Sequence, residues 1–297
     1  MTELPEDHKF EQLVQKIAPQ SRLFRTWQLK GGVSAQVTAV ELERPDGRTK
    51  KMIVRRHGDR DRQRNPQVAA DEFRLLQILQ SKGLAAPKPY YLDQSGEIFS
   101  TPYLVIEYVE GEPEFAPSDL SDYLLQMATQ LAAIHRVDGA KTDLSFLPEQ
   151  GKGFGERPVR LDESPDEGRI RAALESAWPL SRLNKSVLLH GDFWPGNLLW
   201  QNGQLVAVID WEDAKVGDPL ADLAISRLEV LWALGVEAMN AFTKHYQAMT
   251  AIDFTNLPYW DLCAALRRAP QISEWGLDDV TEQRMREEYR WFVRQAE

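Results

Sequence analysis

The chain has 297 residues, of which 43% are hydrophobic and 27% charged, a globular composition that argues against extensive disorder. Its 35 basic and 45 acidic side chains give a net charge of −10, which argues against a general nucleic-acid binder or an anionic-membrane binder, because both normally use a basic surface. The single cysteine, Cys263, excludes an intrachain disulfide and a zinc site of clustered cysteines. We expect a soluble cytoplasmic protein, because the sequence shows neither a secretory-signal pattern nor an apolar run of membrane-spanning length.

The first part of the chain favours strands. Residues 12–56 predict a short helix followed by strands, with a glycine pair dividing QLKGGVSAQVTAVELE as in a hairpin and a Pro-Asp-Gly turn before TKKMIVRR. HGDRDRQRN is expected to be a polar connection, and a helix from about 66 to 82 should end at Gly83. KPYYLD and PYLVIEYV then complete a five-stranded antiparallel sheet with one inserted helix.

From about residue 117 the pattern becomes helical, and a boundary near 109–113 should separate a β-rich lobe from an α-rich lobe. Residues 139–163 are rich in Gly, Pro and charge and predict a loop, after which Ser164-Pro165-Asp166-Glu167 is typical of a helix start. The apolar runs SVLLHGDF and LVAVIDW are expected to form a small hairpin, and the chain from Asp218 onward should be mostly helical.

Three polar residues stand in fixed order in the segment LLHGDFWPGNLLWQNGQLVAVIDWEDA. Asp192 and Asn197 lie in a predicted loop between apolar runs, and Asp210 lies at a predicted strand end. An Asn and an Asp supply the hard oxygen ligands that Mg²⁺ prefers, while a second Asp can accept a proton from a hydroxyl. This combination suits phosphoryl transfer, which needs metal, positioning and a base. A polar turn between strands is the plainer interpretation, but it leaves the ordered pattern unexplained.

His190-Gly191-Asp192, Asn197 and Ile209-Asp210-Trp211 resemble the catalytic and metal-binding motifs of the aminoglycoside phosphotransferase and choline kinase-like family. The resemblance covers roughly residues 23–235. It implies a two-lobed, protein-kinase-like α+β fold, with a nucleotide-binding lobe over 1–109 and a catalytic and substrate-binding lobe over 110–297. It also implies that Asp192 is the base and that Asn197 and Asp210 hold Mg²⁺.

The resemblance extends to residues expected to bind ATP. Arg55, or its neighbour Arg56, stands where the family carries a lysine that contacts the α- and β-phosphates. Glu72 lies on the apolar face of the following helix, so Arg55 is its natural partner. The segment Gly31 to Ser34, with Gly32 and Ser34 as contacts, resembles the phosphate-covering loop, although two adjacent glycines make it sparse. The backbone of Glu107 and Val109 is expected to meet adenine.

Several residues near the motif have structural interpretations. His190 is expected to be structural, Asp218 to cap a helix and Asp222 to hold the backbone of the catalytic loop. Glu212 and Asp213 are expected either to be solvated or to line an acceptor pocket.

The acceptor is expected to be a small molecule, because too few residues separate Asp210 from Asp218 for the long segment on which protein kinases dock peptides. Aminoglycosides, macrolides, choline-like amino alcohols, sugars and homoserine-like amino acids all remain open as acceptors. Two other classes remain: a nucleotide-binding regulator with little catalysis, and a metal-dependent hydrolase using His190, Asp192 and Asp210 as ligands. The oligomeric state and the choice between ATP and GTP stay open.

Overall fold

The computed structural model describes residues 6–29, 35–139, 141–151 and 167–296, with only the backbone described at 269–271. The chain divides into two compact units, residues 1–110 and 111–297. In the described ranges no helix is long and apolar enough to cross a membrane.

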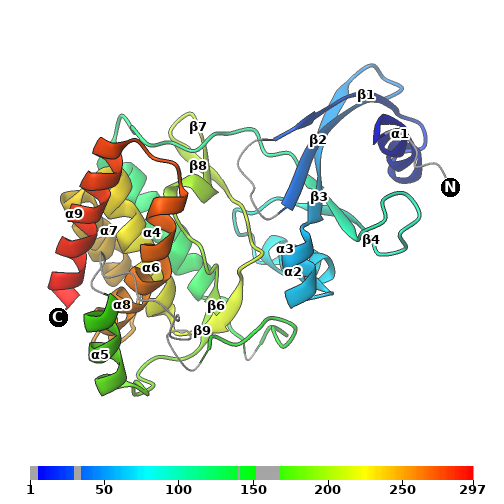
Figure 1. Cartoon of the computed structure of the whole chain (residues 1–297). Coiled ribbons are helices and arrows are strands. Elements are labelled where there is room, and N and C mark those ends of the chain that lie inside the picture. Colours follow the sequence, from blue (N-terminus) through cyan, green and yellow to red (C-terminus); the bar gives the residue numbers. More distant parts are fainter. Residues whose placement is uncertain (1–5, 30–34, 140, 152–166, 297) are drawn as a thin grey trace. The chain divides into compact units, whose positions relative to one another are not determined.

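The first unit is built on a five-stranded antiparallel sheet of order β1-β2-β3-β5-β4 (Figure 1). The predicted sheet is therefore confirmed. Its strands are β1 (Arg22–Gln28), β2 (Ala35–Glu43), β3 (Thr49–His57), β4 (Pro89–Asp93) and β5 (Tyr103–Glu107).

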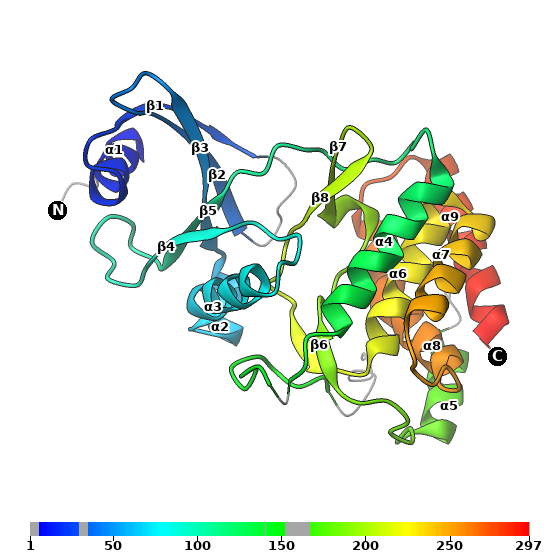
Figure 2. The same cartoon turned by 180° about the vertical axis from the view of Figure 1, so that it is seen from behind.

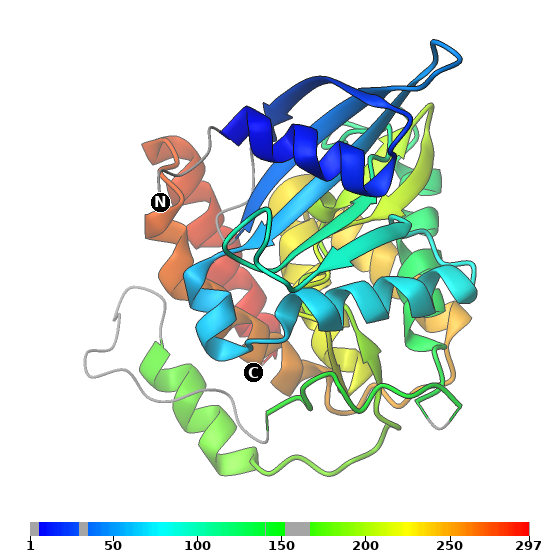
Figure 3. The same ribbon diagram turned by 90° about the vertical axis from the view of Figure 1, so that its right-hand side faces the viewer.

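Helices cover the two faces of this sheet, α1 (Glu6–Ile17) on one and α3 (Val68–Ser81) on the other (Figure 3). α1 contributes Phe10, Leu13 and Val14 to a buried apolar cluster. That cluster also contains alternate residues of the strands, among them Val40, Leu42, Met52, Val54, Tyr103 and Val105. Because successive side chains of a strand point to opposite faces, the intervening residues of β3 belong to the α3 face.

The polar connection expected after β3 is wrong in part, because Asp59–Arg64 forms a short helix, α2. None of its residues is buried, so the segment has no apolar periodicity from which a helix is predicted. Its two acidic residues lie in the first turn and two of its three arginines, Arg62 and Arg64, lie in the last turn, which is the order that favours the helix dipole.

The second unit contains four short strands: β6 (Val187–Leu189), β7 (Leu198–Gln201), β8 (Gln204–Val208) and β9 (Lys215–Gly217). The predicted hairpin between the two apolar runs is wrong. β6 pairs with β9, and β7 pairs with β8 through a tight turn at 202–203. The loop 190–197 and the segment 209–214 therefore connect two small antiparallel ladders.

The helices of this unit are seen in Figure 2. They are α4 (Leu120–His135), α5 (Glu167–Ala177), α6 (Pro219–Leu234), α7 (Val236–Met249), α8 (Leu257–Arg268) and α9 (Asp279–Ala296), with 3₁₀ turns at Pro195–Asn197 and Ala269–Glu274. α6 is central: it packs against α7, α8 and α9 and is buried along nearly its whole length. Residues 164–166 of the predicted start of α5 lie outside the described residues.

Candidate functional site

The loop after β6 carries His190, Gly191 and Asp192 in a tight backbone turn. Gly191 has φ +85°, a conformation that favours glycine. A Cβ atom at this position would lie 2.2 Å from the carbonyl oxygen of Asp213. Only glycine therefore lets the loop pass this close to the 209–214 segment.

A buried carboxylate on α6 holds the loop backbone. Asp222 accepts hydrogen bonds from the backbone N–H of His190 (2.6 Å) and of Gly191 (2.8 Å), and its Oδ2 lies 3.3 Å from His135 Nε2. Burial alone raises the pKa of Asp222, but His135 and the backbone N–H of Gly191 are among the contacts that outweigh it and hold that pKa below its usual value. One turn along α6, Ser226 Oγ donates to the carbonyl oxygen of Phe193 at 2.8 Å. The structural role expected for Asp222 is confirmed.

His190 links the loop to the segment that carries Asp210. Its Nε2 lies 2.9 Å from the carbonyl oxygen of Ile209, and its Nδ1 accepts the backbone N–H of Asp192 at 3.2 Å. Both ring nitrogens are thus engaged within the protein, so His190 is a structural residue rather than a metal ligand. The backbone N–H of Ile209 donates to the carbonyl oxygen of Asn197 at 2.9 Å. These bonds bring Asn197 next to the residue that precedes Asp210.

Asn197 and Asp210 offer the oxygen donors that suit Mg²⁺. The side-chain amide of Asn197 donates to the carbonyl oxygen of Asp192 (2.9 Å) and to its Oδ2 (3.3 Å), so the Asn197 nitrogen is occupied and its Oδ1 is the atom suited to a cation. Asp210 has φ +66°, unusual for a residue with a side chain and typical of functional positions. Among the described residues, no group of three or more His, Cys, Asp or Glu side chains is placed to hold a metal ion.

Two arginines at the end of α8 contact the same loop. Arg268 Nη2 donates to Asp192 Oδ1, and its Nε lies 2.7 Å from Glu229 Oε1 on α6. Arg267 donates to the carbonyl oxygen of Gly191 and, at 2.8 Å, to Asp213 Oδ2. Asp213 is therefore ion-paired rather than simply solvated. Burial raises the pKa of Glu229 to about 7, with Arg268 opposing the shift and the Asp192 charge adding to it.

In the first unit, Arg55 and Glu72 form a buried ion pair, with Arg55 Nε 3.2 Å from Glu72 Oε2. The same oxygen lies 2.7 Å from His57 Nε2, a contact that no local sequence pattern indicates. Burial raises the pKa of Glu72, but the positive charge of Arg55 and the contact with His57 outweigh it, so the pKa lies below its usual value.

Arg55 and Arg56 occupy opposite faces of β3. Arg55 shares the α3 face with His57, whereas Arg56 bonds Glu6 of α1 at 2.5 Å and lies over the ring of Phe99. Arg55 is therefore the cation paired with the buried carboxylate of α3.

The remaining residues predicted to bind nucleotide are only partly placed. The backbone N–H of Glu107 donates to the carbonyl oxygen of Lys88 at 2.8 Å, so a contact with adenine would use the Glu107 carbonyl. Val109 follows the end of β5. Gly32 and Ser34 lie outside the described residues.

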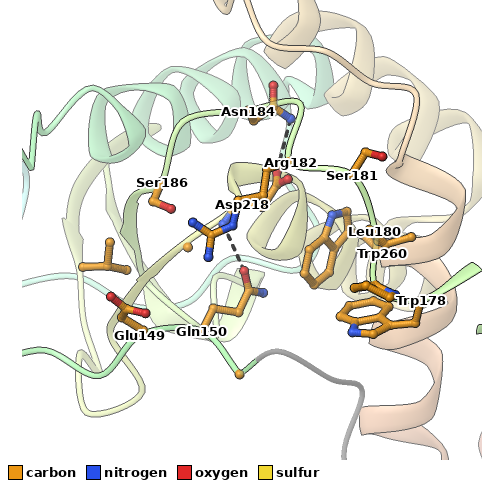
Figure 4. Close-up of a pocket in the computed structure, with 14 residues that line it drawn as sticks. Glu149, Gln150, Trp178, Leu180, Ser181, Arg182, Asn184, Ser186, Asp218 and Trp260 are labelled. Carbon is orange, nitrogen blue, oxygen red and sulfur yellow. Dashed lines mark hydrogen bonds between the residues drawn. The ribbon is translucent and has the colours of Figure 1, made fainter.

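Two cavities in the second unit lie near the β6–β9 ladder. The larger, of about 420 Å³, has the edge-to-face pair Trp178 and Trp260 on one side and the polar side chains Gln150, Asn184 and Asp218 on another (Figure 4). The second, of about 380 Å³, shares Gln150 and Trp260 with it and is bordered by Gly191 and Arg267. An acceptor in the second cavity would lie beside the loop that carries Asp192.

Comparisons with known proteins identify the family of the chain. Residues 26–266 match the model of the "Phosphotransferase enzyme family". The chain is 31% identical over 178 residues to mouse "Acyl-CoA dehydrogenase family member 10", a match over 53% of this chain and 16% of that protein. It is 28% identical over 172 residues to "Viomycin phosphotransferase" of Streptomyces vinaceus, a match over 52% of this chain and 59% of that enzyme. The matches to the acyl-CoA dehydrogenase family members span only 16% to 29% of those proteins.

Solved structures share the fold. A GDP complex of aminoglycoside 2′-phosphotransferase-IIIa has a TM-score of 0.69 at 16% identity, covering 98% of this chain and 99% of that one. Macrolide 2′-phosphotransferase from Brachybacterium faecium has a TM-score of 0.61 at 19% identity, covering 96% and 97%. The expected kinase-like α+β fold and the expected membership of a phosphotransferase family are confirmed. The chain belongs to the phosphotransferase enzyme family typified by the aminoglycoside phosphotransferases.

Proposed function

We propose that the protein is an ATP-dependent kinase of a small hydroxylated molecule. The observation that carries this proposal is the loop geometry: Asp192 lies in a turn fixed by Asp222, and Asn197 contacts both Asp192 and the segment that carries Asp210. A base beside two oxygen ligands for a cation is the arrangement that phosphoryl transfer requires.

In this proposal the first unit binds ATP. Arg55, held by Glu72, would contact the α- and β-phosphates, and its forked guanidinium suits phosphate oxygens. Backbone groups of Glu107 and Val109 would meet adenine. The phosphate-covering role of Gly32 and Ser34 stays a prediction.

In the second unit, Asp192 would orient the acceptor hydroxyl and take its proton as the oxygen attacks the γ-phosphorus. The bond from that phosphorus to the β–γ bridging oxygen breaks, and ADP leaves with the electron pair. Mg²⁺, held by Asn197 and Asp210, would neutralise charge on the β- and γ-phosphates. The chain's own residues then need only position the hydroxyl and accept its proton.

The acceptor is proposed to be small. The segment from Asp210 to the helix cap at Asp218 contains only the short strand β9, so it offers no extended platform for a peptide. The cavity bordered by Gly191 has a volume suited to a small molecule. That relatives include a viomycin phosphotransferase supports this size class. A regulator with little catalysis is the second candidate, and the arginine at position 55 in place of lysine is the feature that favours it.

The test is ADP release from Mg-ATP across viomycin, kanamycin, erythromycin, choline, homoserine and simple sugars. We expect one class to raise turnover in the wild type and Asp192→Ala to abolish that rise while Mg-ATP binding, measured by calorimetry, stays nearly unchanged. Asp46→Ala, at an exposed turn, is the control for the loss of a carboxylate. Binding of Mg-ATP with no transfer to any acceptor would favour the regulator, and wild-type turnover in Asp192→Ala would refute the mechanism.

A further inference from the structure

We propose that Arg268, anchored by Glu229, is a positioning residue that holds the carboxylate of Asp192 in the orientation needed to receive the acceptor hydroxyl. The inference rests on the proposed function, since it concerns the side chain that acts as base there.

Three polar side chains on α6 form the frame for this role. Asp222, Ser226 and Glu229 are spaced by four and then three residues, which places them on one face of the helix. All three are buried, and apart from Arg227 the other residues of the helix are apolar. Asp222 and Ser226 bond backbone atoms of residues 190, 191 and 193. They therefore fix the course of the loop but leave the side chain of Asp192 free to rotate.

Glu229 reaches that side chain through Arg268. The Arg268 guanidinium lies between two carboxylates, with Nε 2.7 Å from Glu229 Oε1 and Nη2 donating to Asp192 Oδ1. The side chains of Arg268 and Glu229 are only 10% and 9% exposed, so solvent screens the pair weakly. On the other side, Asn197 Nδ2 lies 3.3 Å from Asp192 Oδ2. Each carboxylate oxygen is thus held from a different direction.

This arrangement leaves room for the acceptor. A carboxylate has about four lone-pair sites, and the contacts from Arg268 and Asn197 use two of them. A hydroxyl can still donate to Asp192 while both oxygens stay oriented. Loss of the Arg268 contact would free the carboxylate to adopt other rotamers, and misplacement of a reacting group by about 1 Å can cost about 100-fold in rate.

The chain provides a matched control for a purely structural role. Arg227 on α6 makes a buried two-pronged pair with Asp261 on α8, with distances of 3.1 Å to each oxygen. Its side chain is 12% exposed, close to the value for Arg268. Both arginines therefore join α6 to α8 from a buried position. Of the two, Arg268 is the one for which the structure shows a contact with Asp192.

The experiment measures kcat and KM for Mg-ATP and for the panel compound that the wild type phosphorylates fastest, together with urea unfolding. We expect Arg268→Ala to lower kcat about 100-fold with less than about a twofold change in KM for Mg-ATP. Added guanidinium at millimolar concentration should restore part of the kcat of Arg268→Ala. The kcat of Arg268→Lys should lie between those of the wild type and Arg268→Ala, because lysine keeps the charge but lacks the forked guanidinium. Arg227→Ala should lose stability similarly but keep kcat within about threefold of the wild type.

Equal kcat losses in Arg268→Ala and Arg227→Ala, or an unchanged kcat in Arg268→Ala, would overturn the inference while leaving the proposed function intact. Failure of the wild type to phosphorylate any compound would instead overturn the proposed function and this inference with it. If Arg268→Ala does not fold, Glu229→Gln and Arg268→Lys decide the question. Both should then lower kcat severalfold at unchanged KM for Mg-ATP, and a wild-type kcat in both would refute the role.

Discussion

Asp222→Asn tests how far the loop that carries Asp192 depends on one buried carboxylate. The native side chain accepts the N–H groups of His190 and Gly191 on its two oxygens. Asparagine keeps the shape of the side chain but replaces one carboxylate oxygen with an NH₂ group, which is a donor. One of the two backbone N–H groups then loses its acceptor and faces another donor instead. An orphaned buried group costs about 1–3 kcal/mol and a lost charge-assisted bond about 1.5–3 kcal/mol. We therefore expect a loss of about 3–5 kcal/mol in the free energy of unfolding.

The assay is urea unfolding at pH 7, followed by the fluorescence of the nine tryptophans, beside the turnover assay. Asp46→Asn, at an exposed turn, should change the free energy of unfolding by less than about 0.5 kcal/mol. Turnover of Asp222→Asn should fall as well, because the backbone on either side of Asp192 loses its anchor. A variant within about 0.5 kcal/mol of the wild type would refute the claim that Asp222 holds the loop.

The pH dependence of this difference has a defined sign. The native pKa of Asp222 lies below its ordinary value of 3.8, so its ionised form stabilises the folded state above that pH. The stabilisation is lost as the pH falls through the native pKa. The gap between wild type and Asp222→Asn should therefore be constant from about pH 5 to pH 8 and shrink below about pH 4.

Three further predictions concern other parts of the site. Arg55→Ala should weaken Mg-ATP binding, measured by calorimetry, at least about tenfold, equivalent to about 1.4 kcal/mol, whereas Arg56→Ala should not. Equal affinities of the two variants for Mg-ATP would contradict the nucleotide role of Arg55. Because the native pKa of Glu229 is about 7 against an ordinary 4.5, the free energy of unfolding should fall as the pH rises between these values, and urea titrations of Glu229→Gln should show a flatter profile. Gly191→Ala should lower turnover and lower the free energy of unfolding by at least about 1 kcal/mol. The loss of stability should exceed that of Gly203→Ala, because Gly203 has a similar φ of +74° but open space around its Cβ position. Equal losses of stability in the two variants would rule out the steric reason.

Local sequence patterns were sufficient to predict elements that depend on the spacing of apolar and turn-forming residues within one segment. The sheet of the first unit follows from runs of alternating apolar residues with turns between them, and the buried face of α3 follows from the spacing of Leu75, Leu76 and Leu79 relative to Glu72. The order Asp192, Asn197, Asp210 was informative for the same reason, since a motif holds its residues within one short segment. Their roles stay predictions until the variants are measured.

Features that depend on contacts between distant segments could not be read in this way. The apolar runs around residues 188 and 207 look like a hairpin, yet each pairs with a different strand because the partner is decided by the surrounding helices. Arg55 and Arg56 differ only in the face of β3 that they occupy, and that face is defined by α1 and α3. The arginines at 267 and 268 lie far along the chain from Asp192, so no local pattern connects them to it.

One signal for the α6 frame was nevertheless present in the sequence. In PLADLAISRLEVLWAL the polar residues Asp222, Ser226 and Glu229 recur at helical spacing within a run that is otherwise apolar except for Arg227. A buried helix with a polar line along one face must place that line against other polar groups, because unpaired buried polar atoms are costly. The pattern therefore predicts a polar partner packed on α6, although it does not say which one.

The polar residues of α6 have two kinds of partner, backbone atoms and a side chain, and we expect different effects from their loss. Asp222 and Ser226 bond backbone atoms, so their loss should lower the free energy of unfolding and turnover together. Glu229 contacts Arg268, which in turn contacts the side chain of Asp192, so Glu229→Gln should lower turnover more than it lowers the free energy of unfolding. The loss of stability should be small near neutral pH, because Glu229 is already partly protonated there and glutamine resembles the protonated form. Urea unfolding and kcat measured on Asp222→Asn, Ser226→Ala and Glu229→Gln would show whether the two effects separate in this order. If Glu229→Gln lost stability as strongly as Asp222→Asn while keeping its kcat, the frame would support the fold alone, and Asp192 would need no positioning from α8.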